Sequence, residues 1–177
     1  LGIGMKEVEL KKGFPKHYKW VGPSGASVEA GENYPLDLSP FMERKKVLVT
    51  CGTQLAWAKE NLIYQATQLA KDHPDCHFFV TRGVGGEAFQ CENLIENLSV
   101  VSYLPYKEYI SQMDYVIHHG GAGIFYQCII YGKPALILPH DYDQFDYAVR
   151  GVEAGVAFSA KRDNSKAIGQ TFEELLA

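Results

Sequence analysis

From Lys46 to the end of the chain, short apolar runs alternate with longer segments in which apolar residues recur at helical spacing. The first run, residues 47–51, is uninterrupted, as expected for a strand that is buried on both faces. The segment after it, residues 54–71, places residues such as Leu62 and Leu69 on one helical face. Alternation of this kind predicts a parallel sheet with helices on both faces.

The predicted fold is therefore α/β, a Rossmann-like doubly wound parallel sheet of about six strands. We expect the strands at residues 47–51, 76–81, 98–103, 114–117, 135–138 and 156–158. We expect helices at residues 54–71, 87–96 (a short acidic piece), 106–113, 121–131, 143–153 and 164–176.

Residues 1–46 have a different character, because glycine and proline recur through them. This punctuation is typical of an extended connector. We therefore interpret residues 1–46 as an interdomain linker or N-terminal arm and residues 47–177 as the folded domain. Within the arm, residues 5–10 and 16–21 are candidates for short strands, and Tyr18, Trp20 and Val21 are expected to pack onto the domain.

The carboxyl ends of parallel strands meet at one edge of the sheet, and ligands of such folds bind there. Five segments rich in glycine or polar residues follow the predicted strands. They are Gly52-Thr53, Arg82-Gly83, Tyr103-Leu104-Pro105, His119-Gly120-Gly121 and residues 140–144. Their convergence on one rim is a stronger indication of a binding site than any one of them alone.

The glycines Gly120, Gly121 and Gly123 lie between a predicted strand and a predicted helix. Glycine has no Cβ and tolerates positive φ, so the backbone can approach an anion closely. The helix start adds unpaired N–H groups and the positive end of the helix dipole. Together these features predict a phosphate seat, although a tight strand-to-helix turn without a ligand would use the same residues.

Two histidines precede these glycines. Side chains alternate along a strand, so His118 and His119 should point to opposite faces. We expect one of them to pack against the scaffold and His119, nearer the glycines, to be the ligand candidate. Gln127 lies one turn beyond Gly123 on the same helix face, within reach of a ribose.

The segment from His140 to Gln144 contains Asp141 and Asp143, in a carboxylate-x-carboxylate pattern. A hard cation needs several converging oxygen ligands, and the sequence offers no others here, so we expect no metal site. Asp143 and Gln144 fit better as hydrogen-bonding groups for a polyhydroxylated sugar, with a helix N-cap by Asp143 as the alternative. His140 is expected to be structural or to face solvent.

Residues 82–86 form a glycine-rich loop that does not match the dinucleotide fingerprint, because its glycine spacing differs and it follows the second strand. A nicotinamide-dependent enzyme is therefore a weak candidate. Tyr103, at the end of a predicted strand, could stack on a planar base or fill the edge of the core.

Composition excludes several classes of protein. The formal charge is −4 and the pI is near 5.9, without a long basic stretch, which argues against a nucleic-acid interface. The four cysteines show no metal-ligand spacing and are expected to be reduced core residues. No apolar run approaches the length of a membrane span, and no signal peptide is evident. The chain starts at Leu1, which suggests a piece of a longer protein.

The central motif resembles the donor-site signature of GT-B glycosyltransferases that use nucleotide sugars. The motif runs from His118-His119 through the glycines to Gly132-Lys133-Pro134 and ends in Asp143-Gln144. The doubled histidine is most similar to the sterol, macrolide and antibiotic glycosyltransferase branch. The resemblance covers most of the chain and includes three further segments: Phe14-Pro15 with residues 21–23, residues 49–53, and residues 103–106.

Carried over by position, the resemblance implies a role for each matching residue. It assigns the donor diphosphate to His119, Gly120, Gly121, Gly123, Ile124, Gly52 and Thr53. It assigns the base and ribose to Tyr103, Leu104, Tyr106 and Gln127, and the sugar to Asp143 and Gln144.

Four positions depart from the family pattern. Ile124 stands where a Ser or Thr is usual, which removes a hydroxyl bond to phosphate but keeps the N–H. Gln127 replaces a glutamate, so two acceptors become one acceptor and one donor. Tyr106 replaces Gln, and Tyr147 stands where Asn is common. We expect lower donor affinity or an unusual donor.

The resemblance implies transfer of a hexosyl group from a UDP or TDP sugar to an acceptor hydroxyl, with no metal or cofactor. It also implies that the catalytic base and the acceptor pocket belong to an N-terminal domain in cis or to a partner subunit, so this chain alone should be inactive. The alternatives are a separate nucleotide-sugar-binding subunit, half of a sugar-nucleotide epimerase, and a non-enzymatic scaffold. A cytoplasmic location is expected, with peripheral membrane attachment left open.

Overall fold

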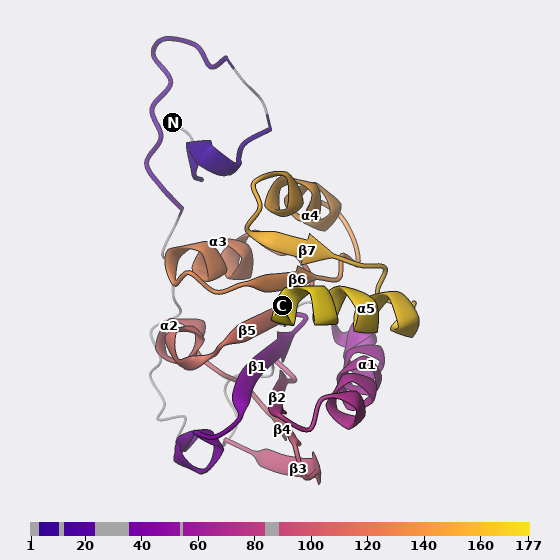
Figure 1. Ribbon diagram of the computed structural model, residues 1–177. Helices are drawn as coiled ribbons and strands as arrows, with labels where there is room; N and C mark the ends of the chain where they lie inside the picture. The colour runs from indigo at the N-terminus through magenta and orange to yellow at the C-terminus, as the bar shows by residue number, and fades with distance from the viewer. Residues whose placement is uncertain (1–3, 11–12, 24–35, 54, 84–88) are drawn as a thin grey trace.

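The computed structural model describes residues 4–10, 13–23, 36–53, 55–83 and 89–177. One twisted sheet runs through the centre of the domain with helices on both of its faces (Figure 1). The strands are β1 (Lys45–Thr50), β2 (Cys76–Thr81), β3 (Cys91–Ile95), β4 (Leu98–Val101), β5 (Tyr115–His118), β6 (Ala135–Ile137) and β7 (Ala157–Ser159). The α-helices are α1 (Lys59–Asp72), α2 (Tyr106–Tyr109), α3 (Ala122–Ile130), α4 (Gln144–Glu153) and α5 (Ser165–Leu176).

The strand order is β3-β4-β2-β1-β5-β6-β7, and all neighbouring pairs are parallel except β3 and β4. From β1 the chain builds the sheet in one direction and then returns to add β5 on the other side of β1. The two central strands β1 and β5 therefore lie at the point where the winding reverses, which is where open α/β sheets bind their ligands. The predicted doubly wound fold is confirmed.

The register aligns the last residues of the central strands in one row. Thr50 of β1 pairs with Thr81 of β2 on one side and with His118 of β5 on the other, and His118 pairs with Ile137 of β6. Because these four strand ends are level, the loops that leave them start side by side. The alignment of the strand ends therefore positions the candidate site.

Two apolar layers sandwich the sheet. On one face, α1 and α5 pack onto strand residues such as Val49 and Phe78, and Phe172 is the fully buried aromatic residue that α5 contributes. On the other face, α2, α3 and α4 pack onto residues such as Leu48 and Phe79. The continuous apolar strand runs in the sequence follow from this burial on both faces.

One element differs in kind from its prediction. The acidic helix predicted at residues 87–96 is wrong, because residues 91–95 form the antiparallel edge strand β3. Four of the five β3 residues are exposed and the fifth is half-buried, so they leave neither an apolar run nor a clear alternation in the sequence. Gln54 and residues 84–88, on which parts of the predictions fall, lie outside the described residues.

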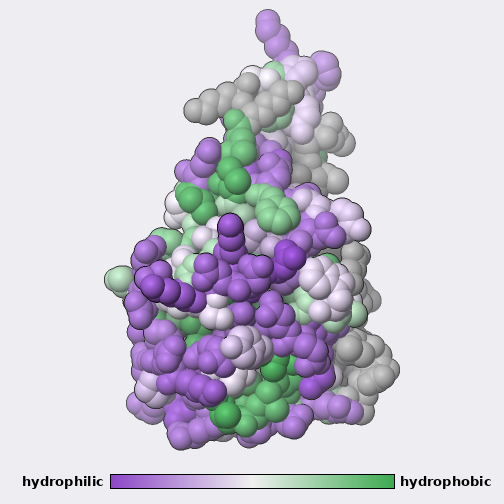
Figure 2. Space-filling view, turned by 90° about the vertical axis from the view of Figure 1, so that its right-hand side faces the viewer, coloured by the Kyte–Doolittle hydropathy of each residue, from purple (hydrophilic) through white to green (hydrophobic). Residues whose placement is uncertain are grey.

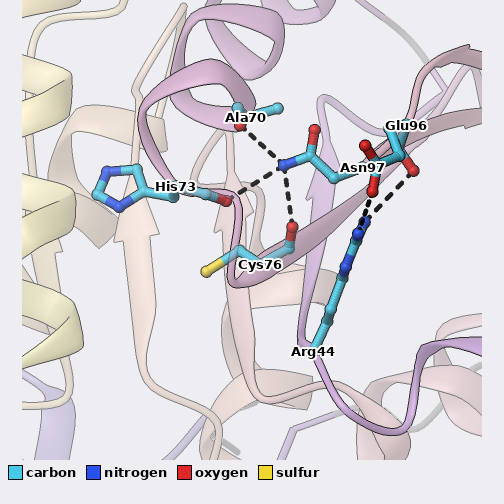
Figure 3. Close-up of polar contacts among 6 residues, drawn as sticks. All are labelled: Arg44, Ala70, His73, Cys76, Glu96 and Asn97. Carbon is cyan, nitrogen blue, oxygen red and sulfur yellow. Dashed lines mark hydrogen bonds and ion pairs between the residues drawn. The ribbon is translucent and has the colours of Figure 1, made fainter.

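The turn before β4 ties the edge of the sheet to α1. The amide nitrogen of Asn97 donates to the carbonyl oxygens of Ala70 at 2.8 Å, Cys76 at 3.1 Å and His73 at 3.2 Å (Figure 3). Arg44, just before β1, forms an ion pair with Glu96 beside it. These contacts fix the C-terminus of α1 against the start of β2.

The N-terminal segment contributes to the domain core. Val8, in the 3₁₀ turn η1 (Lys6–Val8), is 4% exposed, and Leu38 is 7% exposed. Because residues 6–8 form this 3₁₀ turn, the strand predicted at residues 5–10 is wrong. Glu9 forms an ion pair with Arg150 of α4 at 2.5 Å, which fastens this segment to the helix.

The aromatic residues of the arm pack on one another. The rings of Phe14, Tyr18 and Trp20 have centroids 4.8–5.2 Å apart. Val21, for which packing was predicted, is 58% exposed.

The surface of α4 is partly apolar. Phe145, Val149 and Val152 share one helix face and are about half exposed. In the view of Figure 2, a hydrophobic patch interrupts a mostly hydrophilic surface at the height of α4, below the arm.

Candidate functional site

A cavity of about 800 Å³ opens at the carboxyl edge of the sheet. Loops from the ends of β1, β2, β4, β5 and β6 all contribute to its wall, which confirms the predicted convergence of five segments. The lining residues are Gly52, Thr53, Leu55, Trp57, Thr81, Gly83, Tyr103, Leu104, Tyr106, His119, Gly121, Gly123, Ile124, Asp141, Tyr142, Asp143 and Gln144.

The first turn of α3 faces this cavity with unpaired backbone donors. Gly121 is the N-cap residue, in an extended conformation, and no side chain caps the helix start. The first main-chain bond of the helix runs from Phe125 N to Gly121 O at 3.1 Å. The N–H groups of Ala122, Gly123 and Ile124 therefore precede the bonded part of the helix and are free to bind an anion. The side chain of Ile124 is 2% exposed and belongs to the core, so its backbone is what it offers at the helix start.

Gly120 has a different role from its neighbours. Its φ of +91° requires glycine, and a Cβ there would lie 2.9 Å from the carbonyl oxygen of Gln144. Its N–H donates to Nδ1 of His118 at 3.0 Å, and Gly120 does not line the cavity. Gly120 therefore shapes the turn, and its N–H is already used.

The two histidines separate as strand alternation predicts. His118 is completely buried, and burial together with the neighbouring His119 lowers its pKa to about 3. His119 is half-buried and lines the cavity. Burial, and then the charge of His140, lower the pKa of His119 to about 4, against smaller opposing effects of the Thr50 backbone and Asp143. His119 is thus a neutral imidazole at pH 7, and among the described residues its Nδ1 has no hydrogen-bond partner.

Glycines hold the His119 ring on both sides. A Cβ on Gly121 would lie 2.5 Å from Nε2 of His119, and a Cβ on Gly52 would lie 3.0 Å from Cε1. Gly52 is in turn covered by Gly83, where a Cβ would lie 2.2 Å from the Gly52 carbonyl oxygen. The three loops can approach this closely only because these positions lack side chains. The position of the His119 ring is therefore set by the loops after β1, β2 and β5.

A chain of hydroxyl contacts supports the loop after β1. The hydroxyl of Tyr106 lies 2.9 Å from Oγ1 of Thr50, which accepts a hydrogen bond from Gly52 N at 3.1 Å. Burial raises the pKa of Tyr106 to about 12, so its hydroxyl stays protonated. Tyr106 therefore links the loop after β4 to the loop that contains Gly52. Tyr103 and Leu104 line the same side of the cavity, and Leu104 is fully buried.

The loop after β6 presents Asp143 to the cavity. Asp143 is the N-cap residue of α4 but its carboxylate makes no capping bond, so the alternative of a side-chain N-cap is wrong. Gln144 is 6% exposed, and its Oε1 accepts hydrogen bonds from His140 N at 2.9 Å and Asp141 N at 3.0 Å. That oxygen therefore organises the loop, and the amide nitrogen is the part of Gln144 left for a ligand.

Gln127 and His140 lie outside the cavity wall. Gln127 is half-buried on α3 and does not line the cavity. His140 is buried, and its Nδ1 lies 2.6 Å from the Leu138 carbonyl oxygen, in agreement with the structural role that was one of its predicted alternatives.

Sequence reasoning missed Leu55, Trp57 and Thr81 as lining residues, and it gave Tyr142 no role of its own within the rim segment 140–144. Trp57 is 60% exposed and Tyr142 83%. For Trp57 and Tyr142, the signal in the sequence was a large aromatic residue near Gly52 in one case and between two aspartates in the other.

Within the described part of the chain, no group of three or more His, Cys, Asp or Glu side chains is arranged to hold a metal ion. The helices described there include none that is long and apolar enough to cross a membrane. All four cysteines are free, and Cys91 is the exposed one.

Comparison with known proteins places this geometry in context. Residues 85–176 match the family model described as the erythromycin biosynthesis protein CIII-like, C-terminal domain. An uncharacterized UDP-glucosyltransferase of Bacillus subtilis (strain 168), YdhE, is 25% identical over 161 residues, which are 89% of this chain and 39% of that protein.

Solved glycosyltransferase structures share the fold. The glycotransferase of kitacinnamycin superposes with a TM-score of 0.70 at 21% identity, over 89% of this chain and 40% of that chain. The spinosyn rhamnosyltransferase SpnG, solved with thymidine diphosphate, gives a TM-score of 0.63 at 20% identity, over 76% of this chain and 37% of that chain. The chain thus spans about two fifths of the length of these relatives.

Proposed function

We propose, from the premise that the chain belongs to the family of erythromycin biosynthesis protein CIII-like C-terminal domains, that it binds the nucleotide-sugar donor of a glycosyltransferase. The observation that carries the proposal is the free helix N-terminus of α3 beside His119 in a cavity of about 800 Å³. This arrangement suits a diphosphate. In support, one similar protein is named as a UDP-glucosyltransferase, and a solved structure of similar fold is described as a complex with thymidine diphosphate.

The donor is proposed to lie across the cavity in three parts. Its diphosphate occupies the first turn of α3, near Gly121, Gly123 and Ile124, and accepts a hydrogen bond from His119. Its base and ribose lie beside Tyr103 and Leu104, on the side where Tyr106 closes the wall. Its sugar lies toward the loop after β6, where Asp143 accepts hydrogen bonds from hydroxyl groups and the amide nitrogen of Gln144 donates.

Gly52 and Thr53 are proposed to border the phosphates from the loop after β1, since both line the cavity and Gly52 contacts the His119 ring. Gln127 is the weakest of the proposed ribose contacts, because it does not line the cavity.

The proposed reaction is metal-independent transfer of a hexosyl group from a UDP or TDP sugar to an acceptor hydroxyl. The bond between the anomeric carbon and the diphosphate breaks, its electron pair stays on the diphosphate, and the acceptor oxygen bonds to the anomeric carbon. The helix dipole and the His119 N–H stabilise the negative charge that grows on the leaving diphosphate.

The acceptor loses its proton to a base that we assign to a separate N-terminal domain or a partner subunit. The 177-residue chain is therefore expected to bind the donor but to transfer its sugar poorly or not at all.

Calorimetric titration of the chain with UDP, TDP and GDP tests the donor-binding proposal. We expect UDP or TDP to bind, with unchanged affinity when EDTA is present. Failure of all three nucleotides to bind at millimolar concentration would refute donor binding.

The role of His119 has its own test. Loss of one hydrogen bond to a charged group costs about 2 kcal/mol, so His119→Ala should weaken UDP roughly 30-fold. The affinity for uridine, which lacks phosphates, should change little. His17→Ala, at an exposed histidine of the arm, is the matched control. Equal losses for UDP and uridine would contradict a phosphate role for His119.

A further inference from the structure

A side-chain cluster lies behind the loop that carries Asp143. It consists of Trp57 from the turn before α1, His140 from the loop after β6, and Arg162 from the loop after β7. The Trp57 ring lies edge-on to His140 with centroids 5.7 Å apart, and the guanidinium carbon of Arg162 lies 5.4 Å from the centroid of the Trp57 ring. The cluster therefore joins three loops at the carboxyl edge of the sheet.

Arg162 makes the polar contacts of this cluster. Its Nη1 donates to the carbonyl oxygen of His140 at 2.9 Å and lies 3.4 Å from that of Pro139. Its own carbonyl oxygen accepts a hydrogen bond from Nδ2 of Asn61 on α1 at 3.2 Å. The backbone of Arg162 is thus hydrogen-bonded to α1, and its side chain is hydrogen-bonded to the start of the loop after β6.

The loop it contacts has an unusual backbone. Tyr142 adopts a φ of +50°, which a residue with a side chain seldom takes and which costs about 1 kcal/mol or more. The loop is kept in this shape by Oε1 of Gln144 from within and by Arg162 from outside. Asp143, the next residue, has no capping bond of its own, so its position depends on these restraints.

We infer that Arg162 is a positioning residue for the glycosyl-binding loop, residues 140–144, and for the Trp57 side chain on the cavity wall. The inference rests on the proposed function, since it assumes that this loop reads the sugar. Arg162 acts by fixing where Asp143 and Trp57 lie, and it does not itself line the cavity. The diphosphate seat belongs to a different loop, and its contacts with His119 come from Gly52 and Gly121.

This separation predicts a split between two ligands. Arg162→Ala should weaken binding of UDP-glucose about tenfold relative to wild type, because a charge-assisted hydrogen bond that orders the loop is lost. The same substitution should change the affinity for UDP less than about twofold. TDP-glucose and TDP form the corresponding pair if the wild-type chain prefers thymidine nucleotides.

Two further variants keep the test sharp. Arg162→Lys keeps a cationic donor without the planar guanidinium, so it should restore part of the UDP-glucose affinity. Lys161→Ala removes the neighbouring exposed cation and should leave both affinities unchanged. A urea-unfolding curve for each variant confirms that it is folded under the conditions of the titration.

The results divide cleanly. A selective loss of UDP-glucose binding in Arg162→Ala, with partial rescue by lysine, supports the inference. Unchanged UDP-glucose binding, or an equal loss for UDP and UDP-glucose, overturns it and leaves donor binding intact. A wild-type chain that binds neither nucleotides nor nucleotide sugars overturns the proposed function, and the inference falls with it.

Discussion

Buried histidines should make the stability of this domain fall steeply in mild acid. Burial lowers the pKa of His118 to about 3 and that of His77 to about 4, and both side chains are at most 1% exposed. An unfolded histidine has a pKa of about 6.5. Since the folded pKa values are depressed, the unfolded state takes up protons first as the pH decreases. The stability that these two neutral histidines contribute is therefore fully present above about pH 6.5, and it is lost as the pH falls toward 4.

The size of the effect follows from proton linkage. Between pH 7.5 and pH 5, each of these two histidines removes about 2 kcal/mol of unfolding free energy, roughly 1.4 kcal/mol per pH unit below 6.5. The pair together removes about 4 kcal/mol, a large part of the 5–15 kcal/mol typical of a domain. His119 should add to this loss, because its pKa is lowered as well.

Urea unfolding at pH 7.5, 6.5, 5.5 and 5.0, followed by circular dichroism, measures this decline. His77→Gln keeps a hydrogen-bonding group near Ser99, whose Oγ lies 2.8 Å from Nε2 of His77, and should remove about 2 kcal/mol of the loss between pH 7.5 and pH 5. His17→Gln, at an exposed position, is the control and should leave the slope unchanged. Equal stability at pH 7.5 and 5.0, or a His77→Gln variant with the wild-type slope, would refute the reasoning.

Two further pairs of substitutions test close packing at Gly83 and the hydrogen bonds of Asn97. Gly83 and Gly132 have nearly the same φ, +64° and +61°, but a Cβ meets the Gly52 carbonyl at 2.2 Å only at Gly83, whereas Gly132 faces open space. Gly132→Ala should therefore cost about 1–2 kcal/mol of unfolding free energy, and Gly83→Ala at least about 2 kcal/mol more, with weaker UDP binding as well; equal costs in urea unfolding would contradict the close contact. Asn97→Ala removes the donor shared by three carbonyl groups and should cost about 2–3 kcal/mol, while Glu92→Ala, on the exposed strand β3, should cost less than about 1 kcal/mol; similar losses for the two variants would count against the Asn97 contacts.

The fold was predictable wherever burial left a regular pattern. Residues 76–81 are mostly apolar, with His77 and Thr81 as the polar members, and every residue of β2 is buried. Strand β3 was missed because its side chains are mostly exposed and therefore show no apolar periodicity. It is held in the sheet by backbone pairing with β4, which side-chain patterns do not reveal.

The site was predictable as far as the strand ends determine it. Thr50, Thr81 and His118 are level in the sheet, so the loops after them had to converge. The contributions of Trp57 and Arg162 were not predictable in the same way, because they depend on how three separate loops pack on one another. Likewise, nothing in the sequence indicated that Oε1 of Gln144 would be taken up by the backbone of its own loop.

The ion pair between Glu9 and Arg150 limits how far this domain can be truncated from its N-terminus. Arg150 lies on α4, the helix that begins at Gln144 in the glycosyl-binding loop, and the same arm places Val8 in the core. A shortened chain starting at residue 47 would lose Val8 and Leu38 from the apolar layer and leave Arg150 without Glu9. Any recombinant or chimeric version of the domain should therefore retain the arm, since a boundary drawn at the first strand would disturb the helix that leads into the sugar loop.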